Sequence, residues 1–229
     1  MNIQGMQKLT LLDYPGQVAC TIFTGGCQLN CPYCHNSLLI NGPFDDCLAA
    51  EEVLAFLQKR QGLLDGICVS GGEPLLQKEL PEFLRACKNL GYKIKLDTNG
   101  GYPEKLAQLI DAGLVDRVAM DIKNAPEKYA ATCGCEHLDL APYIASRDLL
   151  LSAQVEYEFR TTVVRQLHSF EDVLEIARWI PGARHFYLQA FVDREQVRDH
   201  HLSAYTDEEM RALLSAVQKI LPSAELRGI

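Results

Sequence analysis

Short strand-like segments alternate with amphipathic helical segments along the chain, and this alternation limits the possible folds more than any other feature. Segments rich in β-branched and aromatic residues are followed by stretches with apolar residues at helical spacing. Such alternation is typical of βα units whose strands form a parallel sheet. The sequence therefore predicts the α/β fold class.

Seven strands and six helices are predicted on this basis. The strands are expected at 18–24, 66–70, 92–98, 117–122, 155–164, 185–190 and 224–227. The helices are expected at 49–60, 79–90, 103–112, 142–153, 170–180 and 207–220. The pairs Ser169 with Asp172 and Thr206 with Glu209 have the spacing of capping boxes, which supports the starts of the last two helices.

The number of βα units indicates an incomplete barrel. Six units are fewer than the eight of a closed barrel, and 229 residues are fewer than the roughly 250 that are typical of one. A partial (β/α)6 barrel is the expected architecture, and a doubly wound sheet is the alternative. No linker or repeat interrupts the series, so residues 1–229 are expected to form one domain. In both arrangements the site lies at the C-terminal ends of the strands.

The composition predicts a soluble, cytoplasmic protein that binds neither a membrane nor nucleic acid. The apolar runs are much shorter than the roughly 20 residues of a membrane-spanning helix, and the N-terminus lacks the pattern of a signal peptide. A net charge of -8 disfavours broad binding to a phosphate backbone. Nine cysteines in a cytoplasmic chain are expected to be thiols, metal ligands or redox groups.

Three cysteines, Cys27, Cys31 and Cys34, follow the first predicted strand on one loop. Three closely spaced thiolates can bind three irons of a [4Fe-4S] cluster and leave the fourth iron open to a substrate. Zinc bound by the same cysteines and His35 is the competing interpretation, although adjacent ligands make it awkward. Unliganded core cysteines are the third alternative.

Polar segments also follow the next three predicted strands, at 70–74, 96–100 and 120–123. The glycines of the first segment allow a ligand to approach the backbone closely, whereas strand-end aspartates are also common in ordinary turns. Arg160 lies in the middle of the fifth predicted strand, where an arginine should be paired or should face a cavity. These groups are expected at the rim of the sheet that the C-terminal ends of the strands form.

Together these motifs resemble the radical S-adenosylmethionine (SAM) superfamily, whose signature is Cys-x3-Cys-x-aromatic-Cys with Tyr33 as the aromatic residue. The resemblance implies that the fourth iron binds the amino and carboxylate groups of SAM. It also implies that an electron from the reduced cluster splits SAM into methionine and a 5′-deoxyadenosyl radical. The 70–74 segment looks like the GGEP motif, which implies that Gly71, Gly72 and Glu73 hold the SAM amino group.

The segments at 97–100 and 120–123 are similar to the DTNG and DxK segments of activating enzymes for glycyl radical proteins. This resemblance implies that Asn99 approaches the SAM ribose and that Lys123 pairs with the SAM carboxylate. Arg160 is expected either to contact SAM or to form a salt bridge at the rim. The resemblance also implies a monovalent cation that would balance the charge of a buried acidic pair, with the ligands Asp97, Thr98, Met120 and Asp121.

Softer matches at 13–16, 34–36, 160–164 and 187–191 make the chain most similar to the anaerobic ribonucleoside-triphosphate reductase activating proteins. This resemblance implies that the chain removes a hydrogen atom from a glycine of a partner glycyl radical enzyme, supplied with electrons by a flavodoxin or a ferredoxin-type protein. No acid–base residue is expected. Where several relatives have a histidine on the sixth strand, this chain has Phe191, and Gln189 is the nearest polar residue.

Two rival functions stay open at this point. One is a radical SAM enzyme that acts on a small molecule or a peptide, and the other is a zinc-binding or redox-sensing protein without SAM turnover. The remaining cysteines are given no part in the cluster: residues 35–66 contain only Cys47, and Cys133 and Cys135 with His137 are expected in a loop. Three cysteines on apolar faces are expected in the core, namely Cys20, Cys68 and Cys87.

Overall fold

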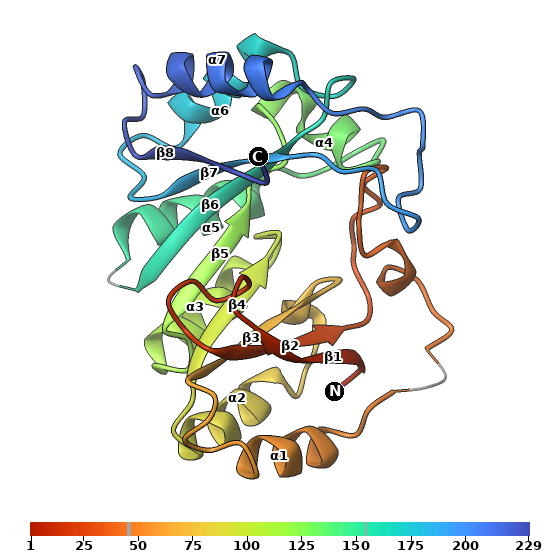
Figure 1. Ribbon diagram of the computed structural model, residues 1–229, viewed down its shortest axis with the longest axis vertical. Helices are drawn as coiled ribbons and strands as arrows, with labels where there is room; N and C mark the ends of the chain where they lie inside the picture. Colours follow the sequence, from red (N-terminus) through yellow and green to blue (C-terminus); the bar gives the residue numbers. More distant parts are fainter. Residues whose placement is uncertain (45–46, 154) are drawn as a thin grey trace.

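The computed structural model describes residues 1–44, 47–153 and 155–229. Its eight strands form one curved sheet in the order β1-β2-β3-β4-β5-β6-β7-β8, the wall of an open barrel (Figure 1). The first strand, β1 (Ile3–Thr10), is antiparallel to β2, and all later neighbours are parallel. The strand order never reverses, which excludes the doubly wound alternative because that fold requires a switch point.

The parallel strands and the main helices match the predicted elements, with ends displaced by no more than three residues. The strands are β2 (Ala19–Thr24), β3 (Gly66–Gly71), β4 (Lys93–Thr98), β5 (Arg117–Asp121), β6 (Glu156–Val163), β7 (Phe186–Ala190) and β8 (Ala224–Arg227). The helices are α1 (Ala50–Gln58), α2 (Leu80–Asn89), α3 (Pro103–Asp111), α5 (Ala141–Ser152), α6 (Phe170–Trp179) and α7 (Asp207–Val217). Both predicted capping boxes are formed.

The sequence analysis missed strand β1 and four short helical turns. Only the two ends of β1, Ile3 and Thr10, are buried, so this edge strand shows no clear hydrophobic alternation. The turns are η1 (Ser37–Leu39), η2 (Pro74–Leu76), η3 (Pro126–Lys128) and α4 (Tyr129–Thr132). Each turn is too short to show a helical repeat.

Helices cover the outer face of the curved sheet, from α1 and α2 beside the first strands to α6 and α7 beside the last (Figure 1). The apolar core lies between the sheet and these helices and includes Leu96, Met120 and Phe159, all fully buried. Because successive side chains of a strand point to opposite faces, the neighbours of these residues face the inside of the barrel. No helix in the described part of the chain is long and apolar enough to cross a membrane.

The three predicted core cysteines are all fully buried, but in two different places. Cys20 and Cys87 belong to the apolar core, as predicted. Cys68 lies instead on the inner face of the sheet, where the Lys95 ammonium group is 4.0 Å from its sulfur. The apolar pattern of β3 did not distinguish its two faces, because a strand buried on both sides has no clear alternation.

We expect Ser169→Ala to lower the free energy of unfolding by about 1 kcal/mol. The Ser169 hydroxyl accepts a hydrogen bond from the backbone N–H of Asp172 at the start of α6, and alanine has no acceptor. Chemical denaturation measures this loss. The matched control is Ser215→Ala, because the Ser215 hydroxyl only donates to the Arg211 carbonyl of its own helix. An equal effect of both substitutions would contradict the capping role.

Candidate functional site

A cavity of about 440 Å³ lies inside the barrel at the C-terminal ends of the strands. Its volume falls within the roughly 300–1,000 Å³ of typical small-molecule sites. The predicted site residues that line it are Cys27, Cys31, Tyr33, Cys34, Gly71, Gly72, Asp97, Thr98, Asn99, Asp121, Lys123, Arg160 and Gln189. Because the carboxyl ends of parallel strands meet at one rim, motifs that are far apart in the sequence surround one space.

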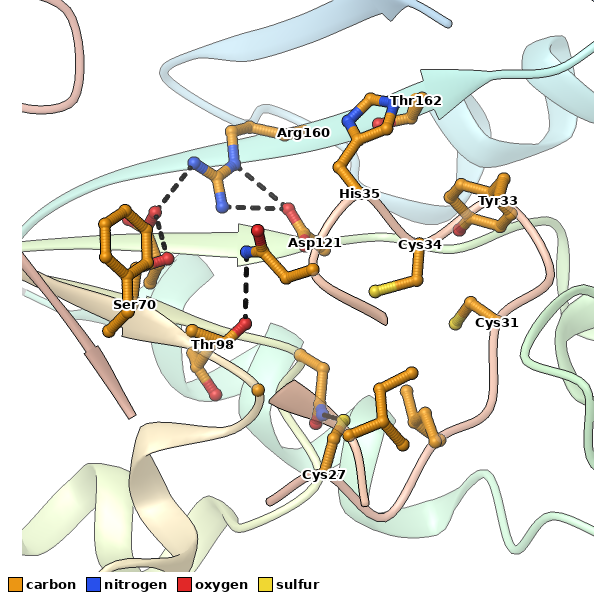
Figure 2. Close-up of a pocket in the computed structure, with 18 of the residues that line it drawn as sticks. Cys27, Cys31, Tyr33, Cys34, His35, Ser70, Thr98, Asp121, Arg160 and Thr162 are labelled. Carbon is orange, nitrogen blue, oxygen red and sulfur yellow. Dashed lines mark hydrogen bonds and ion pairs between the residues drawn. The ribbon is translucent and has the colours of Figure 1, made fainter. Parts of the chain in front are cut away.

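The three motif cysteines lie on the loop after β2, and Figure 2 shows their sulfur atoms turned toward the same space. Cys31 is buried, whereas Cys27 and Cys34 are partly exposed to the cavity. The Asn99 amide lies 3.7 Å from the Cys27 sulfur and connects the loop to the end of β4. The arrangement fits a [4Fe-4S] cluster, in which each cysteine binds a different iron.

The three thiols differ in how readily they ionise. Burial raises the pKa of Cys27 to about 11 and also raises the pKa of Cys34. A hydrogen bond with the Cys133 thiol lowers the pKa of Cys31 to about 7, and this effect exceeds the opposing effect of burial. Because metal ligation requires thiolates, a metal bound here would have to displace the protons of the other two thiols.

The geometry does not support the zinc alternative. Among residues 1–44, 47–153 and 155–229, no group of three or more His, Cys, Asp or Glu side chains is placed to hold a single metal ion. His35, the proposed fourth zinc ligand, is engaged elsewhere: its Nε2 lies 2.8 Å from the Val192 carbonyl oxygen, and its ring stacks on Phe191. Three thiols spread around a larger space are better suited to a cluster than to one zinc ion.

Arg160 joins two carboxylates on the wall of the cavity (Figure 2). Its Nη1 lies 3.2 Å from Asp97 Oδ2, and its Nε lies 3.0 Å from Asp121 Oδ1. Lys95 pairs with Asp97 at 2.5 Å, and Lys123 pairs with Asp121 at 3.0 Å. Burial alone raises the pKa of Asp97, but Arg160 and Lys95 outweigh burial and hold this pKa well below its usual value. Both carboxylates are therefore ionised and balanced by protein cations.

The structure does not support the predicted monovalent cation. Arg160, Lys95 and Lys123 already supply the positive charge that the acidic pair requires. The Met120 side chain does not lie beside that of Asp121, because adjacent residues of a strand point to opposite faces. Its side chain is fully buried in the core on the outer side of the sheet, and its end packs against Gly100.

Gly71 and Gly72 line the cavity, and both positions require glycine for steric reasons. Gly71 has φ of 123°, and a Cβ atom there would lie 2.3 Å from the Thr24 nitrogen. A Cβ on Gly72 would lie 2.1 Å from the Gly26 carbonyl oxygen. The two glycines thus let the turn after β3 pack against the backbone of the cysteine loop.

Glu73 lies behind the cavity wall and does not line the cavity. Its Oε1 accepts hydrogen bonds from the backbone N–H of Leu75 at 3.0 Å and from the Thr98 hydroxyl at 2.8 Å. Its Oε2 accepts from the backbone N–H of Asn99 at 2.7 Å. The side chain therefore connects the turn after β3 with the end of β4 and positions Asn99, instead of facing the cavity as the motif implied.

Several further residues line the cavity, although none of them was predicted to bind the cluster or SAM. They are Gln7, Asp13, Phe23, Leu29, His35, Asn36, Ile40, Ser70, Thr162 and Arg194. Thr162 could have been found from the sequence, because it follows Arg160 by two residues on β6 and so shares its face. Gln7 belongs to the missed strand β1, and Arg194 lies in the loop after β7, so no local pattern identified them. Gln189 of β7 lines the cavity, whereas Phe191, which directly follows this strand, packs on His35.

Comparison with known proteins identifies the family. The Radical SAM superfamily matches residues 21–180. A protein of Methanocaldococcus jannaschii, provisionally named a glycyl-radical enzyme activating enzyme, is 31% identical over 99% of this chain and 96% of its own length. The pyruvate formate-lyase-activating enzyme of Clostridium pasteurianum is 35% identical over 55% of this chain and 54% of its own length. The chain belongs to the radical SAM superfamily and is an enzyme of that class.

Solved structures agree on the fold. Streptococcus suis SuiB bound to S-adenosylmethionine matches 89% of this chain with a TM-score of 0.71 at 15% identity. The AdoMet-bound protein anSMEcpe matches 89% with a TM-score of 0.65 at 17% identity. The matched region spans 48% of SuiB and 61% of anSMEcpe, so both are larger proteins than this chain. At such identities the likeness shows the open radical SAM barrel and nothing further.

We expect the stability difference between the wild type and Glu73→Gln to depend on pH. Burial raises the pKa of Glu73 from 4.5 to about 7, although three hydrogen bonds oppose it. Between these two values the unfolded chain loses the proton while the folded protein keeps it, so Glu73 destabilises the fold progressively as the pH rises from about 4.5 to 7. Over this interval the wild type should lose roughly 3 kcal/mol relative to Glu73→Gln. Denaturation of both proteins at pH 5 and pH 7.5 measures the change, and a pH-independent difference would contradict it.

Proposed function

We propose that this chain activates a glycyl radical enzyme, using a [4Fe-4S] cluster and SAM to remove a hydrogen atom from a backbone glycine of that partner. One observation carries the proposal: a single cavity joins the three cysteines to the polar ends of β3, β4, β5 and β6. A chain related over nearly its whole length has been provisionally given an activating role of this kind. The similarity to pyruvate formate-lyase-activating enzymes supports the same chemistry.

The residues of the cavity have distinct roles in this proposal. Three of them bind irons, namely Cys27, Cys31 and Cys34. Gly71 and Gly72 offer backbone groups to the SAM amino group, because no side chain blocks their approach. Lys123, which is held beside Asp121 at 3.0 Å, pairs with the SAM carboxylate. When bound, the cluster and SAM supply the carbon radical that takes hydrogen from the substrate, so no acid–base residue of the chain is required.

Other residues orient the proposed SAM site. Asn99 lies beside the cysteine loop, where its side-chain oxygen accepts a hydrogen bond from the Gln28 amide at 2.9 Å. Its backbone N–H donates a hydrogen bond to the Glu73 carboxylate. This placement suits contact with the ribose. Arg160 and Asp97 fix the opposite wall, and Tyr33 lies under Lys123, whose Nζ is 6.0 Å from the ring centre. Gln189 is the polar residue that β7 contributes to the wall of the cavity, where its side chain can contact SAM.

The open side of the barrel suits a protein substrate. The edge strands β1 and β8 do not pair with each other in the described part of the chain, so no strand closes the barrel between them. We propose that a glycine loop of the partner reaches the cavity from this side. The partner proposed is an anaerobic ribonucleotide reductase, and the proposed electron donor is a flavodoxin or a ferredoxin-type protein.

Electron paramagnetic resonance tests this proposal directly. The reconstituted enzyme, SAM and a reductant are mixed without oxygen with an anaerobic ribonucleotide reductase. We expect a glycyl radical doublet on the reductase that collapses when its glycines carry deuterium at Cα, with deuterium appearing in 5′-deoxyadenosine. A reductase with alanine at the radical glycine is the control. SAM cleavage without any glycyl signal would contradict this choice of partner.

A further inference from the structure

His168, which the sequence analysis did not single out, lies behind the wall of the cavity in the loop between β6 and α6. It is fully buried, unlike the other five histidines of the chain, all of which lie within the described residues. Its ring Nε2 lies 2.8 Å from the backbone carbonyl oxygen of Lys123. A buried imidazole thus contacts the backbone of the residue that is proposed to pair with the SAM carboxylate.

The neighbouring groups determine which ring nitrogen of His168 carries the proton. A carbonyl oxygen only accepts, so Nε2 must carry the proton that it donates to Lys123. Nδ1 accepts from the backbone N–H of Val164 at 3.1 Å. The Val164 carbonyl oxygen, 3.3 Å from Nδ1, already accepts from the backbone N–H groups of Leu167 and His168. His168 is therefore a neutral imidazole with its proton on Nε2.

The same histidine packs against Tyr33. The two ring centres lie 6.5 Å apart and the ring planes meet at 78°, so one ring presents its edge to the other. The Lys123 ammonium lies 6.0 Å from the centre of the Tyr33 ring and 3.0 Å from the Asp121 carboxylate. His168 thus supports both the backbone from which the lysine side chain extends and the aromatic ring beside its charged end.

Further hydrogen bonds anchor the loop that carries His168. Its backbone carbonyl accepts from the Tyr205 hydroxyl at 2.7 Å. Asn124, which follows Lys123, donates from its side chain to the Leu167 carbonyl at 2.9 Å. The loop after β5 and the loop after β6 therefore each donate one side-chain hydrogen bond to the backbone of the other. Because both donor side chains are fully buried, water does not readily replace these bonds.

The position of the Lys123 ammonium depends on this support. A lysine side chain is a flexible stem with four rotatable bonds, so its charged end is well placed only when its backbone and neighbours are fixed. Without the Nε2 donor, the Lys123 carbonyl would lose its printed partner inside the protein, and the loop would have to move to satisfy it. A moved backbone carries the ammonium away from its place beside Asp121.

We propose that His168 is a positioning residue, which holds Lys123 and Tyr33 in place for the SAM carboxylate by donating a hydrogen bond from Nε2. It contacts neither SAM nor iron and acts through Lys123. The inference rests on the proposed function in one respect, the assignment of Lys123 to the SAM carboxylate. Because this ion pair exists both before and during cleavage, loss of the support should weaken SAM binding more than it slows cleavage.

The test compares His168→Gln with His168→Asn in the reconstituted protein. Glutamine can place its amide N–H near the position of Nε2, whereas the shorter asparagine reaches only the position of Nδ1. We expect His168→Asn to weaken SAM binding, measured by anaerobic calorimetry, by roughly tenfold or more. Its KM for SAM should rise with little change in kcat, and His168→Gln should stay close to the wild type. His200→Asn is the matched control, because His200 is exposed and pairs with Asp193.

Each outcome decides the inference. Unchanged affinity in His168→Asn, or an equal loss in both variants, overturns it, because packing alone would not favour glutamine. If neither variant folds, nitrogen-15 NMR of the wild type with labelled histidine decides. A slowly exchanging histidine with its proton on Nε2 supports the inference, and a proton on Nδ1 overturns it. A wild type that holds a full cluster but binds no SAM would refute the proposed function, while the NMR measurement would still decide the hydrogen bond.

Discussion

Arg160 is the residue on which the inner face of the barrel most depends, because its guanidinium joins carboxylates of two other strands. Asp97 lies one residue before the end of β4, Asp121 ends β5 and Arg160 lies on β6, so one side chain ties three neighbouring strands together. The three side chains are partly buried, so their charges are only partly screened by water and removal of the guanidinium would leave both carboxylates less well compensated. Without Arg160, Asp97 would keep only Lys95 as a partner and Asp121 only Lys123.

A further carboxylate, which is fully buried, extends this arrangement toward the far edge of the sheet. Glu158, two residues before Arg160 and on the same face, is fully buried and pairs with Arg117 at 2.6 Å and with Arg227 at 2.8 Å. The inner face of β5, β6 and β8 is thus held together by ion pairs, while the outer face packs apolar side chains against helices. This division leaves a polar chamber inside an otherwise ordinary α/β fold, and charged cofactors require such a chamber.

The sequence predicted most of the fold because its strongest signals are local. Period-two and helical patterns locate strands and helices, and parallel strands necessarily bring their carboxyl ends to one rim. That rule placed Asp97 and Asp121 together, and Arg160 was expected either to contact SAM or to form a salt bridge at the rim. Strand β1 escaped because an edge strand with only its ends buried has no such pattern.

Three features of the site depend on contacts that local sequence patterns do not report. Met120 was grouped with Asp121 by a motif, although strand alternation places the two side chains on opposite faces. Glu73 was expected at the ligand, but its burial and three hydrogen bonds make it a support for Asn99. Cys133 lies beside the cysteine loop, where its carbonyl oxygen accepts from the Asn30 N–H, only because two segments distant in the sequence pack together, and no local pattern reports such a contact.

The central claim is that the three cysteines and the polar wall of the cavity form one radical SAM site. Anaerobic reconstitution, followed by addition of SAM and a strong reductant and quantification of 5′-deoxyadenosine, tests it most directly. The account predicts product from the wild type and from Cys47→Ala, which removes an exposed cysteine outside the motif, and none from Cys34→Ala. Equal product from Cys34→Ala, or no product from a wild type with a full iron and sulfide content, would contradict it.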